Sequence, residues 1–305
     1  MPRQSTVSSP PAAGIVGFGA FGRLAATHLR SHFAVRAFDP SPGDLPPVPG
    51  VTLGSLADAA SCPIVILAVP VCHLAETVAA IAPHVRAGAI VLDVGSVKLG
   101  PARIMAAGLP EAVEIVATHP LFGPQSARDG IRGLKIAICP MRGGSFRRVA
   151  AFLRRALGLD VIVTTPEAHD REAALAQGLT HLIAKVLVQM EPLPTRITTR
   201  SFELLLQAVD MVRDDAPEIF DAIERQNPFA ADVRRRFFDL AADLDRTLGT
   251  ADGDPATVVR SMARRRHPAA VACERTALDP AAGAMFGDPA ATKERQGLIG
   301  CTSSR

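Results

Sequence analysis

The sequence lacks any apolar run that approaches the ~18 residues of a membrane-spanning helix. It also lacks an excess of charge of either sign, because 33 basic residues stand against 30 acidic ones and the formal net charge is +3. The short arginine clusters Arg234–Arg236 and Arg264–Arg266 are typical of solvated helix faces. These features argue against a membrane protein and against a protein that binds nucleic acid.

Paired cysteines are lacking as well. The five cysteines form no close CxxC pair; they are Cys62, Cys72, Cys139, Cys273 and Cys301. Structural zinc sites generally use such pairs, so we expect no bound metal and reduced, mostly buried thiols. The N-terminal stretch MPRQSTVSSPPAA has no apolar core of the kind that a secretory signal requires. We therefore expect a cytoplasmic protein.

The distribution of apolar residues divides the chain into two parts. A chain of 305 residues, 48% of them hydrophobic, is long enough for two domains. Up to about Pro166, short apolar runs such as IVILAV and AIVLDV alternate with helical patterns. Continuous apolar strands of this kind are typical of a parallel sheet that is covered on both faces. The pattern predicts an α/β fold with a Rossmann-type, doubly wound, mostly parallel sheet, followed by an all-helical domain.

The predicted organisation has four segments: a disordered lead (residues 1–11), a dinucleotide-binding domain (12–165), a helical substrate and dimerisation domain (166–266) and a loose tail (267–305). The predicted strands are Gly14–Phe18, Ala34–Phe38, Ile64–Val69, Ala89–Asp93, Glu114–Thr118, Lys135–Cys139 and Val161–Thr164. The helices predicted between them are Phe21–His32, Leu74–His84, Lys98–Ala107 and Phe146–Leu157. The helices predicted for the second domain are Glu167–Gln189, Ser201–Asp214, Pro217–Gln226 and Phe229–Leu248.

A glycine-rich turn, GFGAFG, joins the first predicted strand to the first helix. Gly17 permits a tight turn, Gly19 lets the backbone approach a pyrophosphate, and Gly22 lets helix and strand pack closely. The free N–H groups and the dipole of the helix N-terminus favour an anion. A GxGxxG motif alone also fits a structural turn, but here a strand precedes it and a helix follows it. The predicted cofactor contacts are Gly17, Phe18, Gly19, Ala20, Phe21, Gly22, Val69 and Pro70.

An acidic residue ends the second predicted strand. Asp39 follows AVRAF at about the ~20-residue spacing expected for the ribose-binding acid. Its carboxylate would accept hydrogen bonds from both ribose hydroxyls and repel a 2′-phosphate, and no Arg or Lys follows it through Gly50. The sequence therefore predicts NAD rather than NADP as the cofactor. The alternative is a turn-forming aspartate before Pro40.

Two polar segments, LDVGSVK and ATHPLFGP, emerge from apolar strands, where a doubly wound sheet places its chemistry. His119 follows such a strand and suits a general base, because an unperturbed histidine has a pKa of ~6.5. A loop histidine bonded to the backbone is the alternative. Ser96 by itself is more typical of an N-cap for the following helix, and Lys98 is compatible with a solvent-facing position.

The order GFGAFG, DVGSVK, THPLFGP and HD followed by QGLTH resembles the prephenate/arogenate dehydrogenase family, from about Gly14 to Asp245. DVGSVK followed by HPLFGP is the most specific part of the resemblance. The resemblance implies a Rossmann-type domain, a helical domain that forms a homodimer, and NAD as cofactor. It also implies oxidative decarboxylation of a cyclohexadienyl acid, arogenate or prephenate, in tyrosine synthesis.

The same resemblance assigns the reacting groups. His119 would take the proton of the ring C4 hydroxyl, and Ser96 would hydrogen-bond that hydroxyl and orient the histidine. A hydride would leave C4 for the nicotinamide, and CO2 would depart as the ring becomes aromatic. The protein would mainly supply orientation and a base.

In the helical domain, Gln177, Thr180 and His181 of QGLTH match positions that line the substrate pocket. For Gln177 and Thr180, a hydrogen bond between helices is an equal alternative. His169 and Asp170 open the same predicted helix, and capping is the expected role of Asp170.

The side chain of the substrate depends on a few further positions. The ammonium of arogenate favours a nearby carboxylate, whereas the second carboxylate of prephenate, which has a keto group and no ammonium beside it, favours a bidentate arginine. Gln207 stands where bacterial prephenate-using relatives often have an arginine, and an acid near Asp215 is associated with arogenate preference in plant-type relatives. We therefore favour arogenate, although capping before Pro217 also explains Asp214 and Asp215. Candidate partners for the substrate carboxylate are Arg200, Arg213 and Arg225.

Two other functions remain open from the sequence. β-Hydroxyacid dehydrogenases pair similar domains but use a lysine on a glycine-rich helix. Only Lys185 of the four lysines lies in the predicted helical domain, and its helix has the single glycine Gly178. A catalytically silent, NAD-binding redox sensor is the second alternative, and it would not need both Ser96 and His119.

Overall fold

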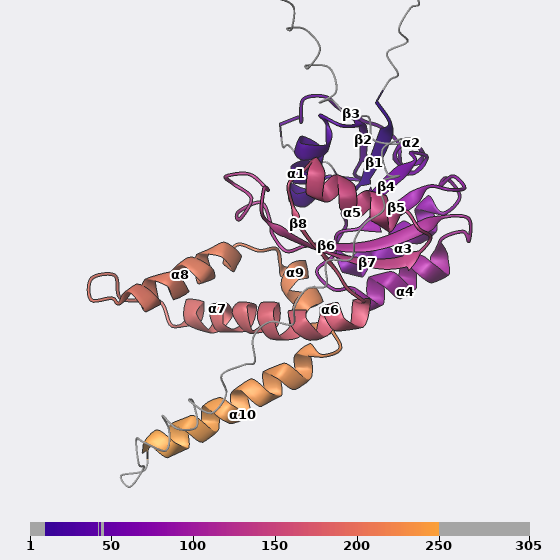
Figure 1. The fold of residues 1–305 in the computed structure, drawn as a ribbon. Helices are drawn as coiled ribbons and strands as arrows, with labels where there is room; N and C mark the ends of the chain where they lie inside the picture. Colours follow the sequence, from indigo (N-terminus) through magenta and orange to yellow (C-terminus); the bar gives the residue numbers. More distant parts are fainter. Residues whose placement is uncertain (1–9, 42, 44–45, 250–305) are drawn as a thin grey trace, which may run out of the picture.

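The computed structural model describes residues 10–41, 43 and 46–249, so the predicted tail and most of the predicted lead lie outside the described residues. An eight-stranded sheet with the order β3-β2-β1-β4-β5-β6-β7-β8 forms the first part of the chain (Figure 1). The strand pairs are parallel, apart from the antiparallel pair β6–β7. These features confirm the predicted mostly parallel, Rossmann-type sheet with a helical region after it.

The strands are β1 (Ala12–Val16), β2 (Ala34–Phe38), β3 (Val51–Leu53), β4 (Ile64–Leu67), β5 (Ile90–Asp93), β6 (Glu114–Pro120), β7 (Lys135–Arg142) and β8 (Asp160–Val163). The helices of this part are α1 (Ala20–Leu29), α2 (Leu56–Ala60), the short 3₁₀ turn η1 (Val71–His73), α3 (Leu74–Ile81), α4 (Leu99–Gly108) and α5 (Phe146–Arg155). The short elements β3 and α2 were not predicted, because three and five residues are too few to show a period.

Both faces of the sheet are buried, as its continuous apolar strands predict. Neighbouring residues of a strand point to opposite faces, so Val16 packs in the cluster with α2, α3 and α4. Ile15 packs instead in the cluster that contains Ala26 and Leu29 of α1. A further cluster, around Val149 and Ala150 of α5, covers the sheet beyond β4. The sheet is therefore the central layer between two helical layers.

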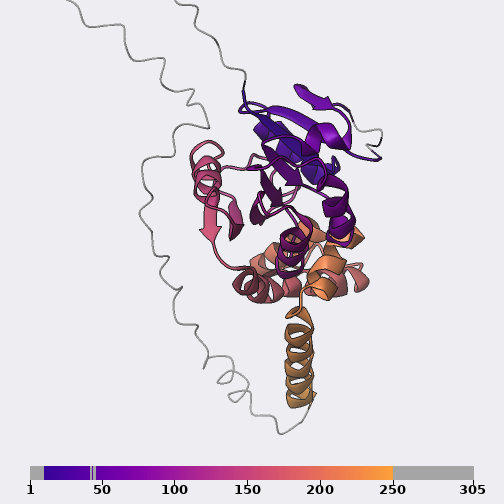
Figure 2. The same ribbon diagram turned by 90° about the vertical axis from the view of Figure 1, so that its right-hand side faces the viewer.

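The remaining described elements are helical. They are α6 (Pro166–Ala173), the π-helical turn η2 (Ala174–Gly178), α7 (Leu179–Gln189), α8 (Arg200–Val212), α9 (Pro217–Asp221), the π-helical turn η3 (Ala222–Gln226) and α10 (Ala230–Gly249). Figure 1 shows α6 and α7 as one rod, and Figures 1 and 2 both show α10 extending away from the rest of the described chain. None of the helices in the described residues is long and apolar enough to cross a membrane.

Local chemistry explains where the long rod begins. Pro166 occupies the first turn of α6, and the Thr165 hydroxyl accepts a hydrogen bond from the Ala168 N–H at 3.2 Å. The single helix predicted over Glu167–Gln189 is present, with the π turn η2 inside it. Such a turn is often found at functional sites, and η2 contains Gln177.

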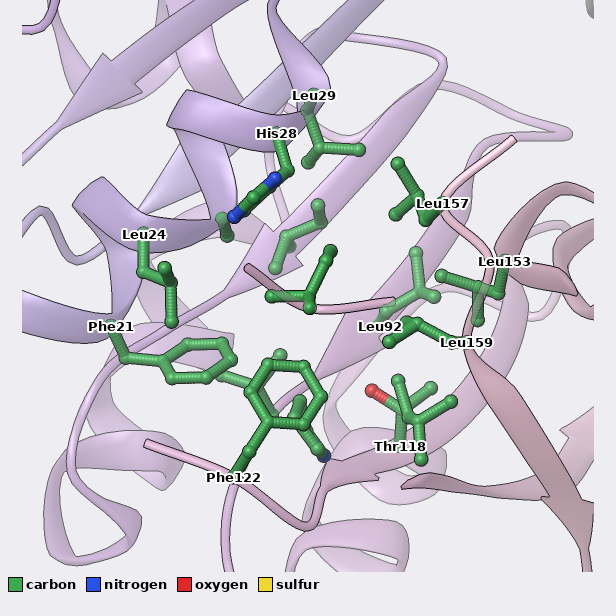
Figure 3. Close-up of a pocket in the computed structure, with 16 residues that line it drawn as sticks. Phe21, Leu24, His28, Leu29, Leu92, Thr118, Phe122, Leu153, Leu157 and Leu159 are labelled. Atoms are coloured by element: carbon green, nitrogen blue, oxygen red, sulfur yellow. The ribbon is translucent and has the colours of Figure 1, made fainter. Parts of the chain in front are cut away.

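A small apolar cavity lies between α1, α5 and the sheet (Figure 3). Its volume is about 90 Å³, and Phe21 and Phe122 stand at its border with the larger cleft described below. The two rings are tilted against each other with centroids 6.3 Å apart. The cavity brings no group of catalytic residues together.

Candidate active site

The turn after β1 has the geometry of a phosphate cradle. Gly17 has a φ of +96°, and a Cβ at this position would lie 2.4 Å from the carbonyl oxygen of Ala68. A Cβ on Gly22 would lie 2.1 Å from the carbonyl oxygen of Gly17. At Gly19, in contrast, a Cβ would meet no atom within 4 Å, so the backbone there is open to a ligand. Gly17 and Gly22 are thus required by close backbone packing, and the open backbone at Gly19 is compatible with its predicted contact to a pyrophosphate.

The N-terminus of α1 faces this cradle. Its N-cap Gly19 makes no side-chain capping bond, and the first turn carries no acidic residue. The first N–H groups of the helix are therefore not capped by its own side chains. Gly19, Ala20 and Phe21 line the large cleft, whereas Phe18 is buried in the core behind it. These features fit the pyrophosphate of a dinucleotide.

Asp39 lies immediately after β2, beside the same turn. One carboxylate oxygen accepts the Phe18 N–H at 2.6 Å, and the other accepts the Ser41 N–H at 2.8 Å. The bond to Ser41 is the turn-forming contact that the sequence left as the alternative. Each carboxylate oxygen has two lone pairs, so Asp39 retains capacity for ribose hydroxyls. The structural and the cofactor-binding interpretations are therefore compatible.

A cleft of about 610 Å³ connects the cradle to the helical region. The sheet side includes Val69 and Pro70 after β4, Ser96 after β5, and His119 in β6. The helical side supplies the lining residues Gln177, Thr180, His181, Ala208, Met211, Val212, Asp215, Ala216, Glu218, Ile219 and Ala222. Most of the predicted cofactor and substrate residues therefore line one cavity.

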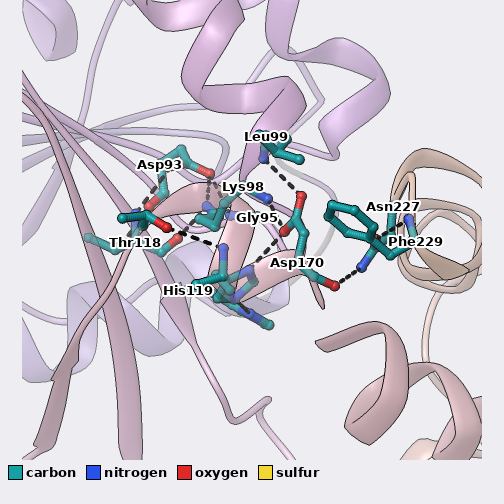
Figure 4. Close-up of polar contacts among 12 residues, drawn as sticks. Asp93, Gly95, Lys98, Leu99, Thr118, His119, Asp170, Asn227 and Phe229 are labelled. Carbon is teal, nitrogen blue, oxygen red and sulfur yellow. Dashed lines mark hydrogen bonds and ion pairs between the residues drawn. The ribbon is translucent and has the colours of Figure 1, made fainter. Parts of the chain in front are cut away.

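His119 lines this cleft from the sheet side and is buried, with 3% of its surface exposed. Its Nδ1 lies 2.8 Å from Nε2 of His169, and Nδ1 of His169 lies 2.8 Å from Oδ1 of Asp170 (Figure 4). Burial holds the pKa of His119 well below its usual range, and the positive charges of His169, when protonated, and Lys98 act in the same direction. His119 is therefore neutral at physiological pH, as a general base must be.

Asp170 does not cap the helix that it opens, contrary to the prediction. Thr165, not Asp170, caps α6, and the Asp170 carboxylate instead accepts the backbone N–H groups of Lys98 at 2.7 Å and Leu99 at 2.9 Å. It therefore caps α4, a helix about 70 residues earlier in the chain. A carboxylate at this end of a helix is favoured by the helix dipole. Sequence spacing within one helix gave no signal of this long-range cap.

Lys98 also differs from its predicted exposed position. Its side chain is fully buried and forms an ion pair with Asp93 at the end of β5 (Figure 4). The ammonium donates a second hydrogen bond, of 2.5 Å, to the carbonyl oxygen of Thr118. This carbonyl belongs to the peptide unit that joins Thr118 to His119, so the bond from Lys98 restrains the backbone beside His119. Lys98 is also the N-cap residue of α4, which removes the predicted capping role of Ser96.

The helical side of the cleft contains two buried polar atoms without a hydrogen-bond partner among the described residues, Oε1 of Gln177 and Nδ1 of His181. Unsatisfied buried atoms of this kind are costly and point to a polar ligand. Thr180 instead donates its hydroxyl to the carbonyl of Ala176 at 2.8 Å, within its own helix. Gln207 is exposed and does not line the cleft, so the structure does not bring it together with the other predicted substrate residues.

Asp215 lies 3.7 Å from Nε2 of His181. Burial lowers the pKa of His181 to about 4 and raises the pKa of Asp215. An ion pair would shift both pKa values in the opposite directions, so desolvation outweighs the attraction between these two groups. His181 is neutral at physiological pH.

The predicted arginine partners point elsewhere. Arg200, Arg213 and Arg225 form ion pairs with Glu203, Glu191 and Asp221, respectively. Among the described residues that line the cleft there is no arginine or lysine, and its acids are Asp215 and Glu218. No group of His, Cys, Asp and Glu side chains in the described part of the chain has the geometry of a metal site.

The fold and the cradle define a nucleotide-binding α/β domain joined to a helical domain. A family model for the nucleotide-binding domain of prephenate dehydrogenase matches residues 52–140, which include Ser96 and His119. The "probable arogenate/prephenate dehydrogenase" of Methanocaldococcus jannaschii is 28% identical over 200 residues, covering 62% of this chain and 44% of that protein. Arogenate dehydrogenase 1 (chloroplastic) of Arabidopsis thaliana is 29% identical over 238 residues, covering 73% and 37%. The chain thus spans less than half the length of these curated relatives.

Solved structures share the fold across both parts. Prephenate dehydrogenase from A. aeolicus, in complex with hydroxyphenyl propionate and NAD+, matches with a TM-score of 0.61 at 19% identity, over 85% of this chain and 94% of that one. A putative prephenate dehydrogenase from Corynebacterium glutamicum matches with a TM-score of 0.64 at 18% identity, over 84% and 87%. These structures show the shared fold, while the family model over residues 52–140 and the curated relatives bear out the resemblance to the prephenate/arogenate dehydrogenase family that the motifs predicted.

The buried Lys98–Asp93 pair yields a stability prediction. The substitution Lys98→Met should lower the free energy of unfolding by about 3–5 kcal/mol, because it leaves the Asp93 carboxylate buried without its cation. Urea denaturation followed by circular dichroism measures the loss. Lys135→Met, at an exposed lysine at the start of β7, is the matched control and should change little. A loss below ~1 kcal/mol for Lys98→Met would contradict the structural role of the pair.

The low pKa of His181 yields a prediction for pH dependence. In the unfolded chain His181 has a pKa of ~6.5, so between pH 4 and 6.5 the unfolded state binds a proton that the folded state does not. Above pH 6.5 this titration therefore does not reduce the free energy of unfolding. As the pH falls below 6.5 the free energy of unfolding decreases, by about 2 kcal/mol at pH 5. His181→Gln should lose less stability than the wild type between pH 7.5 and pH 5 in urea denaturation. His84→Gln, at an exposed histidine, should behave like the wild type; equal slopes in all three proteins would refute the assignment.

Proposed function

We propose that this protein is a dehydrogenase that uses NAD to oxidise and decarboxylate arogenate, and to a lesser extent prephenate, in tyrosine biosynthesis. The observation that carries the proposal is a neutral, buried histidine in the same cleft as an open glycine cradle. The sequence match over residues 52–140 and the similarity to arogenate and prephenate dehydrogenases support the same chemistry.

The residues of the cleft would divide the work as follows. The Nε2 atom of His119 accepts the proton of the substrate's ring C4 hydroxyl, and Ser96, which lines the cleft, hydrogen-bonds the same hydroxyl. NAD, when bound, supplies the acceptor for the hydride from C4. Loss of CO2 then makes the ring aromatic, so the protein's task is to hold the ring and to keep His119 neutral.

The cofactor preference rests on the cradle and on Asp39. Gly17, Gly19 and Gly22 would admit the pyrophosphate against the N-terminus of α1, and Asp39 would accept the ribose hydroxyls. A 2′-phosphate would meet the negative charge of Asp39. NAD is therefore the favoured cofactor over NADP.

The substrate preference rests on the charges that line the helical side. Asp215 and Glu218 are suited to the ammonium of arogenate. The buried Oε1 of Gln177 and Nδ1 of His181, which have no hydrogen-bond partner among the described residues, offer further polar contacts. Prephenate has a keto group in place of the ammonium, so its side-chain carboxylate would lie near these acids without a positive charge to offset the repulsion. The charges of the cleft therefore favour arogenate.

We also propose a homodimer in the cytoplasm. Large apolar side chains remain exposed on the helical elements, among them Leu204 on α8 and Leu240 and Leu248 on α10. Exposed apolar residues that gather on long helices are typical of protein interfaces. The similarity to a dehydrogenase family with a helical dimerisation domain supports this assembly.

The rival enzyme class finds less support in the site. A β-hydroxyacid-type dehydrogenase would need a lysine in the cleft, but Lys185 does not line it and instead lies 5.9 Å from the ring of Phe220. The sensor hypothesis does not explain why a neutral histidine with a supporting network faces the cleft.

The activity is tested with purified protein, NAD or NADP, and arogenate or prephenate at equal concentrations. We expect NADH formation with arogenate and a lower rate with prephenate or with NADP. His119→Asn should bind NAD normally but lower kcat by ~10²–10⁴-fold, which is the usual contribution of a general base. His84→Asn is the control at an exposed histidine. Full turnover by His119→Asn would remove His119 from the mechanism, and no turnover of either substrate by the wild type would refute the proposed reaction.

A second experiment tests the role of Asp215. Asp215→Asn removes the charge that would pair with the ammonium of arogenate, and a charged hydrogen bond contributes about 1.5–3 kcal/mol. The ratio of kcat/KM for arogenate to that for prephenate should therefore fall by ~10–100-fold. Asp214→Asn changes the neighbouring exposed aspartate, which does not line the cleft, and should leave the ratio unchanged. An equal ratio in all three proteins would show that Asp215 does not select the substrate.

A further inference from the structure

His119, which lines the cleft, is linked to a chain of buried polar groups for which the sequence predicted no role beyond helix capping. The chain runs from His119 to His169 and from His169 to Asp170, with 2.8 Å at each step. The three residues are 3%, 6% and 0% exposed. Solvent therefore does not supply alternative partners for the atoms that join them, and the hydrogens must be arranged within the chain.

Asp170 determines the direction of these hydrogen bonds. Its two carboxylate oxygens already accept the backbone N–H groups of Lys98 and Leu99, which cannot rotate away or become acceptors. Asp170 is thus an acceptor toward His169, and Nδ1 of His169 carries the hydrogen. In a neutral imidazole the other nitrogen is then bare, so Nε2 of His169 accepts from Nδ1–H of His119. By the same rule, Nε2 of His119 is left with a free lone pair.

We propose that His169 and Asp170 are positioning residues that hold His119 as the tautomer with hydrogen on Nδ1, so that its Nε2 faces the cleft as a base. His119 Nε2 makes no hydrogen bond with any of the described residues, and His119 lines the cleft. The catalytic consequence rests on the proposed function, whereas the tautomer itself does not. When Nε2 takes up the substrate proton, Nδ1–H keeps its bond to His169, and the negative charge of Asp170 lies beyond that ring.

The arrangement spans the two parts of the chain. His119 belongs to β6, whereas His169 and Asp170 belong to α6, the first helix after the sheet. The carbonyl oxygen of Asp170 also accepts a hydrogen bond of 2.8 Å from the side-chain amide of Asn227, just after η3 (Figure 4). The tautomer of His119 is therefore fixed only when α6 packs against the sheet. The same packing brings the two sides of the cleft together.

Substitution of His169 separates an orienting role from a packing role. In His169→Gln, the side-chain NH₂ can donate only toward Asp170, which leaves the amide oxygen to accept from Nδ1–H of His119. This variant should keep the polarity of the chain. In His169→Leu, a similar volume remains but the acceptor is lost. Glu167→Gln, two residues earlier at an exposed position of α6, is the control.

The tautomers can be read directly by NMR of the full chain labelled with ¹⁵N-histidine, without substrate. The losses of signals in His119→Asn and His169→Gln assign the two rings. We expect His119 to carry its hydrogen on Nδ1 in the wild type, in His169→Gln and in Glu167→Gln, and to populate both tautomers in His169→Leu. A wild-type His119 with its hydrogen on Nε2 would overturn the proposal, whether or not the protein turns over arogenate or prephenate.

Kinetics supply the second measurement. His169→Leu should lower kcat by about 10²-fold with KM changed less than threefold, because misplacement of a reacting group by ~1 Å has an effect of this size. His169→Gln should stay within about tenfold of the wild type, and Glu167→Gln should match it. Equal kcat values for His169→Leu and the wild type would overturn the positioning role. If His169→Leu does not fold, the wild-type tautomer and the His169→Gln rate still decide the question.

Discussion

The contact on which the cleft depends is the cap that Asp170 forms on α4. Both oxygens of this buried carboxylate accept backbone N–H groups at the start of that helix, so the first helix after the sheet is attached to the sheet's own covering layer. The attraction has a simple origin, because the N-terminus of a helix has free donors and a partial positive charge. The contact attaches α6 to α4 beside the cleft that His119 and His181 both line.

The second constraint is the buried charge pair beneath the cap. Lys98 reaches from the start of α4 to Asp93 at the end of β5 and to the carbonyl of Thr118 in β6. Two strand ends and one helix are thereby held at one point, directly before the catalytic candidate His119. Such a pair contributes little net stability compared with apolar packing, but it permits only one arrangement of its neighbours. Its positive charge also helps keep His119 neutral.

Much of the fold could be predicted from the sequence because its signals are local. The apolar strands, the helical periods and the glycine turn each depend on adjacent residues, and their order indicates the sheet. The positions of His119 and Ser96 followed from strand ends and motifs. Lys98, His169 and Asp170 could not be placed in this way, because Lys98 bonds to Thr118, His169 to His119 and Asp170 to Lys98, which are 20, 50 and 72 residues away, respectively. Gln207 lies outside the lining of the cleft for a related reason, because a match to a family position does not show which face of α8 meets the cleft.

The cleft therefore combines an anion cradle, a neutral base and an acid-lined helical wall, and the central claim is that hydride leaves the ring carbon bearing the hydroxyl that His119 deprotonates. The most direct measurement uses arogenate deuterated at ring C4, together with NAD and the purified protein, and determines the mass of the reduced cofactor. The account predicts that each reduced cofactor formed carries one deuterium from the substrate. Reduced cofactor without deuterium, or no reduced cofactor at all, would contradict it.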